Sequence, residues 1–133
     1  MPLLNLRIAA TPNRALAARA AATLQDLTVQ LLGKQAELIA IAVDFVDPAT
    51  WFVAGRPLSD WQRSSFSLEI KITDETNTKA EKARYIAAVF EAFSDLLGPL
   101  HTESYIHVHD VRPAAYGYGG RTQEWRYHHP GKA

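Results

Sequence analysis

The side chains of this sequence that could do chemistry are few. The chain contains no cysteine, which excludes a thiolate nucleophile, a zinc–thiolate site and an iron–sulfur cluster. His107 and His109 are two residues apart and would share one face of a strand. Two more histidines, His128 and His129, lie near the C-terminus. A metal site needs a third ligand at a defined distance, and residues 125–132 are expected to form a mobile terminus. We therefore expect no bound metal and no cofactor.

Two further candidates stand next to expected structural elements. Pro2 follows Met1 directly, but proline is common after an initiator methionine because it protects the terminus. Pro2 alone therefore does not indicate catalysis. Lys34 follows Gly33, at the expected end of a helix. A basic residue there complements the helix dipole, or it can pair with the carboxylate of a substrate.

Four strands and two helices are expected to position these residues. Alternating apolar side chains predict strands over residues 3–9, 39–43, 66–72 and 105–109. Apolar residues three or four apart predict helices over residues 12–32 and 78–97, which end at Gly33 and Gly98. The first helix is expected to have Thr11 as its cap and Pro12 at its first position. The two apolar stripes are Leu16, Ala20, Leu24, Leu27 and Leu31, and Ala83, Ile86, Phe90, Phe93 and Leu97.

The second half of the chain repeats the first. Gly98 lies 65 residues after Gly33, and the same offset relates Ile106 to Ile41. At an offset of 64, Phe66 stands where the first half has Pro2. This regularity predicts an internal duplication of a β-α-β unit. We expect a single domain over residues 1–133, with repeats at about 2–61 and 66–125.

The expected fold class is α/β: tandem β-α-β units form a four-stranded sheet with two helices on one face. Glycine-containing segments at 54–55 and 117–120 predict short hairpins. The helix-free face would carry small and polar side chains, with Arg7 and Glu69 as interface or channel charges. A monomer would leave this face and the sheet edges open, so we expect three copies to enclose a shared centre as a homotrimer.

Composition excludes several classes of partner. The 14 basic and 14 acidic side chains balance, which argues against a basic surface for nucleic acid. No apolar run approaches 18 residues, so no membrane span is expected. The first residues lack a basic segment followed by an apolar one, so no signal peptide is expected. A cytoplasmic protein that binds a small molecule is the resulting expectation.

The duplicated unit and its opening Met-Pro-apolar residues resemble the tautomerase superfamily. The similarity is to the macrophage migration inhibitory factor group and to fused forms of 4-oxalocrotonate tautomerase, and it covers nearly the whole chain. The matching stretches are Pro2–Leu6, Leu32–Lys34, Ile39–Val43, Tyr105–His107 and Ala114–Gly120.

The resemblance implies an enolising tautomerase in which Pro2, exposed by removal of Met1, is the general base. A free α-amino group has a pKa of about 8, which apolar burial and nearby cations lower. A shift of about 2 units costs about 2.7 kcal/mol and leaves the base largely unprotonated at pH 7. Such a base is suited to removing a proton next to a carbonyl group, and a secondary amine is also a nucleophile toward aldehydes and ketones.

The resemblance also implies roles for four other residues. Lys34 would pair with a substrate carboxylate, and Tyr118 would form a wall of the pocket. Tyr105 and His107 would line the pocket, partly from a neighbouring subunit. His107 could donate to a carbonyl oxygen or could lie in a channel of the trimer.

The sequence lacks substrate-binding residues of several groups in the family, and this limits the range of substrates that we expect. Ala9, Ala10 and Ala40 stand where the oxalocrotonate enzyme has arginines that bind a dicarboxylate. Residues 73–77 lack the arginine pair of the decarboxylase and dehalogenase groups. Together with Lys34, these departures favour a monocarboxylate such as an aryl or alkyl 2-oxo acid. Two alternatives remain: a hydratase, dehalogenase or decarboxylase of the same family, or a non-catalytic binding protein on this scaffold.

Overall fold

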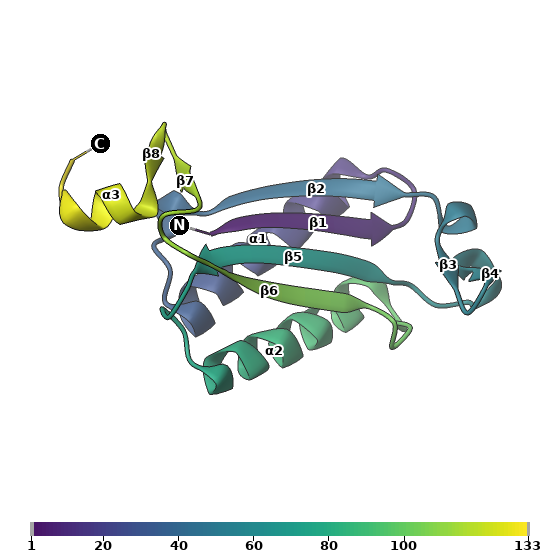
Figure 1. Ribbon diagram of the computed structural model, residues 1–133. Coiled ribbons are helices and arrows are strands. Elements are labelled where there is room, and N and C mark those ends of the chain that lie inside the picture. Colours follow the sequence, from purple (N-terminus) through teal and green to yellow (C-terminus); the bar gives the residue numbers. More distant parts are fainter. Residues whose placement is uncertain (1, 133) are drawn as a thin grey trace.

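The computed structural model describes residues 2–132 (Figure 1). Met1 and Ala133, the two ends of the expected domain, lie outside the described residues. The main elements in order are β1 (Leu3–Ala9), α1 (Arg14–Leu32), β2 (Ala40–Val46), β3 (Phe52–Val53), β4 (Arg56–Pro57), β5 (Phe66–Thr73), α2 (Lys79–Leu97), β6 (Tyr105–Val111), β7 (Gly117–Tyr118), β8 (Arg121–Thr122) and α3 (Gln123–His128). Short 3-10 turns cover Ala36–Leu38, Pro48–Thr50 and Leu58–Asp60.

Within residues 2–132, the main sheet has four strands in the order β2-β1-β5-β6. β1 pairs with β2 in parallel and with β5 antiparallel, and β5 pairs with β6 in parallel. Helices α1 and α2 lie together on one face of this sheet (Figure 1). The expected α/β class and its two β-α-β units are therefore confirmed.

The core lies between the sheet and the two helices. Leu4, Leu6 and Ile8 are fully buried, and the residues that alternate with them are exposed on the opposite face. Full burial of such a side chain contributes roughly 1.5–3 kcal/mol. In this single chain the helix-free face stays open, as the alternation predicts.

The start of α1 differs from the expectation, which is wrong at this point. The cap is Asn13, whose side-chain oxygen accepts a hydrogen bond from the Leu16 amide at 3.1 Å. Thr11 and Pro12 therefore precede the helix, since an asparagine closer to the first turn satisfies its free amides. The end is as expected: Gly33 has φ +67°, a left-handed conformation that glycine adopts without strain.

The buried row of α2 also differs from the expected stripe. Tyr85, Val89 and Phe93 are fully buried, whereas Ile86 is 37% exposed. The reason is a polar contact inside the core, because the Tyr85 hydroxyl lies 2.9 Å from the Thr28 hydroxyl of α1. This partner makes burial of a tyrosine favourable, and a count of apolar residues does not detect it.

Two hairpins and a C-terminal helix complete the chain. Both expected hairpins are present, as β3-β4 and β7-β8, and each pairs only within itself. The expectation of a mobile terminus at residues 125–132 is wrong for residues 125–128, because they belong to α3. The Thr122 hydroxyl caps α3 by accepting from the Trp125 amide at 2.9 Å. Figure 1 shows the β7-β8 hairpin and α3 next to the N-terminal end of β1.

In the described part of the chain, no helix is both long enough and apolar enough to cross a membrane.

Candidate active site

Pro2 is buried at one end of the main sheet. Its carbonyl oxygen accepts a hydrogen bond from the Ala40 amide at 3.2 Å. The next residue, Leu3, pairs with Ala40 on one side and with Lys71 on the other. Pro2 therefore lies where the chain enters β2 and where β5 ends.

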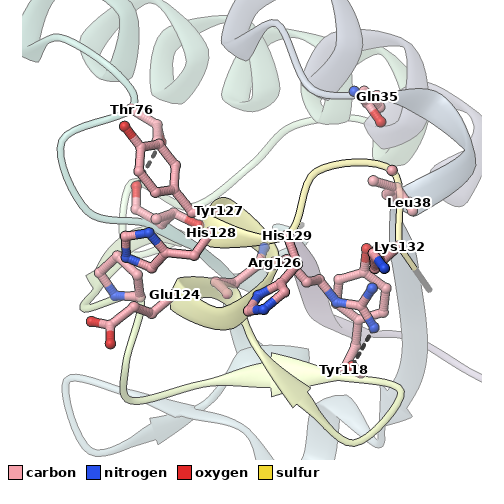
Figure 2. Close-up of a pocket in the computed structure, with 14 residues that line it drawn as sticks. Gln35, Leu38, Thr76, Tyr118, Glu124, Arg126, Tyr127, His128, His129 and Lys132 are labelled. Carbon is pink, nitrogen blue, oxygen red and sulfur yellow. Dashed lines mark hydrogen bonds between the residues drawn. The ribbon is translucent and has the colours of Figure 1, made fainter.

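A cavity of about 650 Å³ opens at this same end of the sheet (Figure 2). Leu38, just before β2, and Thr73, the last residue of β5, line it, so it borders the position of Pro2 on both sides. Tyr118 of β7 and Arg126 of α3 also line it. Pro2 itself is not among the lining residues. The volume is within the usual range for a small-molecule site.

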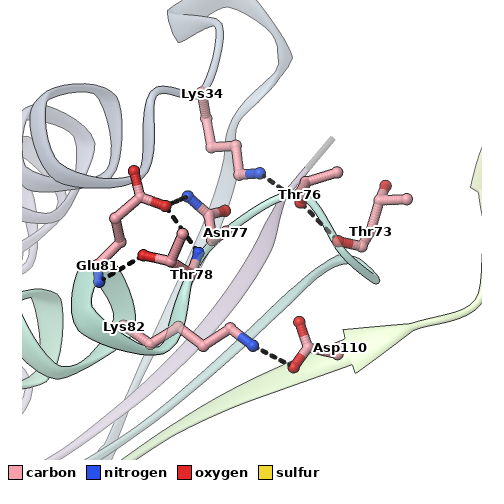
Figure 3. A network of polar contacts seen from close by, with 8 residues as sticks. All are labelled: Lys34, Thr73, Thr76, Asn77, Thr78, Glu81, Lys82 and Asp110. Atoms are coloured by element: carbon pink, nitrogen blue, oxygen red, sulfur yellow. Dashed lines mark hydrogen bonds and ion pairs between the residues drawn. The ribbon is translucent and has the colours of Figure 1, made fainter.

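Lys34 is positioned by the end of α1 and reaches the loop between β5 and α2 (Figure 3). Its ammonium donates to the Thr76 hydroxyl at 3.0 Å, and that hydroxyl donates to the Thr73 carbonyl oxygen at 2.5 Å. Burial lowers the pKa of Lys34, and the negative charges of Glu81 and Asp110 partly oppose this shift. Thr76 lines the cavity, whereas Lys34 itself does not.

The same loop is held by the first turn of α2. Thr78 and Glu81 form a reciprocal capping box, in which the Thr78 amide donates to the Glu81 carboxylate at 2.7 Å (Figure 3). This hydrogen bond lowers the pKa of Glu81. The Asn77 amide group donates to the Leu32 carbonyl at the end of α1 at 2.9 Å. The backbone that carries Thr73 and Thr76 is thus fixed to both long helices.

Tyr118 lines the cavity, and it has a partner that the sequence did not indicate. The Arg126 guanidinium lies 3.9 Å from the centre of the Tyr118 ring and donates to the Tyr118 carbonyl oxygen at 2.9 Å. One signal could have placed Arg126 on a helix: Thr122, a good cap residue, precedes Gln123 and Glu124. A segment expected to be mobile would not hold Arg126 at a fixed place in a site, whereas α3 does.

Tyr105 and His107 lie away from Pro2 in the single chain. Tyr105 pairs with Ser67, which itself pairs with Arg7, so Tyr105 is near the far end of the sheet. There it borders a second cavity, of about 500 Å³. Its hydroxyl donates to the Glu103 carboxylate at 2.6 Å, and this contact raises the pKa of Tyr105. The rings of Tyr105 and His107 stack on the open face, with their centres 5.9 Å apart.

The His107 and His109 rings are neighbours on that open face, with centres 5.7 Å apart. Among residues 2–132, no group of three histidine, aspartate or glutamate side chains is gathered so as to hold a metal ion.

The sequence and the fold were compared with those of known proteins. No family model matches the sequence, and no curated protein matches it. Among solved structures, native fused 4-OT superposes with a TM-score of 0.79 at 22% identity, over 92% of this chain and 97% of that chain. FG41 malonate semialdehyde decarboxylase, inhibited by 3-bromopropiolate, gives 0.74 at 18% identity, over 98% and 99%. A macrophage migration inhibitory factor homologue from Prochlorococcus marinus gives 0.74 at 18%, over 90% and 97%.

The chain has the fold of the tautomerase superfamily. The expected resemblance is thereby confirmed for the fold, and it extends over nearly the whole chain, as expected. The structural neighbours of this tautomerase fold include a tautomerase, a decarboxylase and a macrophage migration inhibitory factor homologue. Two other fused 4-OT structures with the same fold are trimers, one symmetric and one asymmetric.

Proposed function

We propose that this protein is a keto-enol tautomerase whose general base is the nitrogen of Pro2, made N-terminal by loss of Met1. The substrate is a 2-oxo acid or a related enolisable carboxylate. The observation that carries the proposal is the place of Pro2: it is buried at the end of β1, next to a cavity of small-molecule size. Burial lowers the pKa of a terminal amine, which makes it a usable base near pH 7.

The reaction moves one proton. The Pro2 nitrogen takes it from the carbon next to the carbonyl group, and the electron pair left behind forms the enolate. Polar groups at the rim of the cavity hold the enolate oxygen. The same proton then returns to the oxygen or to another carbon of the enolate, which leaves Pro2 free again.

Four other residues are proposed to complete the site. Tyr118 forms one wall, and Lys34 assists in binding the substrate carboxylate. Tyr105 and His107 come from a neighbouring subunit of a homotrimer, since they lie far from Pro2 in their own chain. The open face of the sheet and the trimeric fused 4-OT neighbours support this assembly.

A decarboxylase is the second candidate, because the FG41 enzyme superposes over 98% of this chain. The structure lacks basic side chains in the loop of residues 74–77, where the sequence lacks the arginine pair expected of that group. For this reason we place enolisation first, and a non-catalytic binding protein on the same fold last.

The test compares two forms of the same chain. The form that has lost Met1 should enolise a phenylenolpyruvate-like substrate, and should do so with a higher kcat/KM than for 2-hydroxymuconate, because the site is suited to one carboxylate. A matched form with a short N-terminal extension carries Pro2 as an amide without a usable lone pair, and should be inactive. Equal rates of enolisation by both folded forms would contradict the proposal.

A further inference from the structure

Arg126 is a positively charged residue of this cavity that forms no ion pair with any other described residue. Its side chain is one of the cavity's lining residues, and among residues 2–132 no carboxylate lies within ion-pair distance of it. Glu124 also lines the cavity, but Figure 2 shows its carboxylate well away from the guanidinium, which lies at Tyr118. Lys132, the other permanent cation of the lining, is exposed near the end of the chain.

The guanidinium of Arg126 is held in place from two directions. The Tyr118 ring lies under it at 3.9 Å, and the Tyr118 carbonyl accepts from Nη2 at 2.9 Å. Gly119 leaves room for it, since a Cβ atom at that position would lie 2.9 Å from Nη2. The buried Nε has no hydrogen-bond partner among the described residues. The group is therefore preorganised, and part of its donor capacity is unused.

Lys34 differs from Arg126 in its place relative to the cavity. The Lys34 ammonium already donates to Thr76, lies in the field of Glu81 and Asp110, and does not line the cavity. Its contacts fasten the loop between β5 and α2 to the end of α1. A planar guanidinium also matches a carboxylate with two parallel hydrogen bonds, which an ammonium cannot offer.

We propose that Arg126 binds the carboxylate of the substrate and thereby sets the preference of the site for 2-oxo monocarboxylates. This inference rests on the proposed function for the identity of the substrate. The recognised chemistry is a single carboxylate attached to an apolar tail, which would lie against the Tyr118 ring and Leu38 of the same cavity.

The test uses Arg126→Gln in the form that has lost Met1, with Arg121→Gln as the matched control. Arg121 also stacks on an aromatic ring, that of Trp125 at 4.5 Å, but it does not line this cavity. Arg126→Gln should raise KM for phenylenolpyruvate at least about tenfold with less change in kcat, the signature of lost ground-state binding. It should also reduce the preference for the acid over its methyl ester. Arg126→Lys should recover part of the affinity, and Arg121→Gln should behave as the parent.

A binding measurement separates this inference from the proposed function. Calorimetry with phenylpyruvate should give binding to the parent chain and at least about tenfold weaker binding to Arg126→Gln, whether or not the protein turns over substrate. Inorganic phosphate serves as the second probe and should bind more weakly than phenylpyruvate. A folded Arg126→Gln variant with unchanged affinity for phenylpyruvate would overturn the assignment. So would a loss of affinity in Lys34→Gln that Arg126→Gln does not share.

Discussion

In the proposed reaction the reactive atom of Pro2 is a backbone nitrogen, so the residue that precedes it decides whether the base exists. The nitrogen is part of an amide while Met1 is attached, and becomes a secondary amine once Met1 is removed. A substitution of Pro2 should also disturb the backbone hydrogen bonds of the sheet very little. Pro2 has no amide hydrogen to donate, and its carbonyl already accepts from Ala40. Its ring, by contrast, gives the amine a fixed direction.

Pro2→Ala should therefore reduce activity without unfolding the protein. The variant keeps a terminal amine but loses the rigidity of the ring, and kcat/KM for a 2-oxo acid should fall about 10²-fold or more. The pH profile of the parent should show a base that titrates below the ~8 of an ordinary terminus. Steady-state kinetics between pH 5 and pH 9, with intact-mass analysis to confirm removal of Met1, measure both quantities. A fall of less than threefold would assign the base elsewhere.

Substitution of Tyr85 tests the polar contact between Tyr85 and Thr28 inside the core. Burial raises the pKa of Tyr85 to about 12, and its hydroxyl finds a partner only in Thr28. Tyr85→Phe should lower the free energy of unfolding by about 1–3 kcal/mol, because it leaves the Thr28 hydroxyl buried without that partner. The double variant Thr28→Val/Tyr85→Phe should recover much of this loss. Urea denaturation of the four proteins measures the coupling, and strictly additive losses would contradict it.

At the scale of elements, α2 is stabilised by its capping box at neutral pH and loses this stabilisation at low pH. The pKa of Glu81 is below its ordinary value of 4.5 because its charged form accepts from the Thr78 amide. Its contribution to stability is thus complete above pH 4.5 and is lost as the pH falls through the lowered value. Glu81→Gln should lower the denaturation midpoint at pH 7, and this difference should shrink toward pH 3. Glu91→Gln, exposed on the same helix, should show no such trend.

The sequence predicted elements better than it predicted contacts between them. Strict alternation, as in Leu4, Leu6 and Ile8 of β1, was enough to predict the four strands of the main sheet, and the repeat predicted that they belong to two β-α-β units. The three differences have one cause. Asn13 as cap, Tyr85 in the core and Arg126 over Tyr118 all depend on a specific hydrogen-bond partner. Periodicity carries no information about such partners, especially when they are far apart in the chain.

For the candidate site, too, the sequence predicted the residues better than the contacts between them. A proline at position 2 and an aromatic residue in a glycine-rich hairpin are visible in the sequence, and the structure brings the hairpin to the end of the sheet where Pro2 lies. Two features are not visible in the sequence: the hydrogen bond from the Lys34 ammonium to the Thr76 hydroxyl, and the approach of α3 to the cavity. Both arise from how separate elements pack.

At the scale of the whole molecule, the open face of the sheet predicts assembly. Ala42 is exposed there, in β2, and a trimer would cover it. The parent chain should be trimeric at micromolar concentration, and Ala42→Glu should shift it toward monomers, because the substitution would bury a charge without a partner. Ala87→Glu, on an exposed position of α2, is the control. Light scattering coupled to size-exclusion chromatography measures the mass of each, and a monomeric parent chain would contradict the prediction.

The two cavities lie at opposite ends of one sheet, and matching positions of the proposed repeat face them: Tyr118 lines the first, and Val53, 65 residues earlier, lines the second. Phe66, wholly buried, stands in the second half where the first half has Pro2. A polypeptide has a single amino terminus. If duplication joined two such units head to tail, the peptide bond at the junction consumed the amine of the second. Selection for the proposed enolisation would then act only on the end of the sheet that carries Pro2, and the cavity at the other end would be free to bind something else or to serve packing alone.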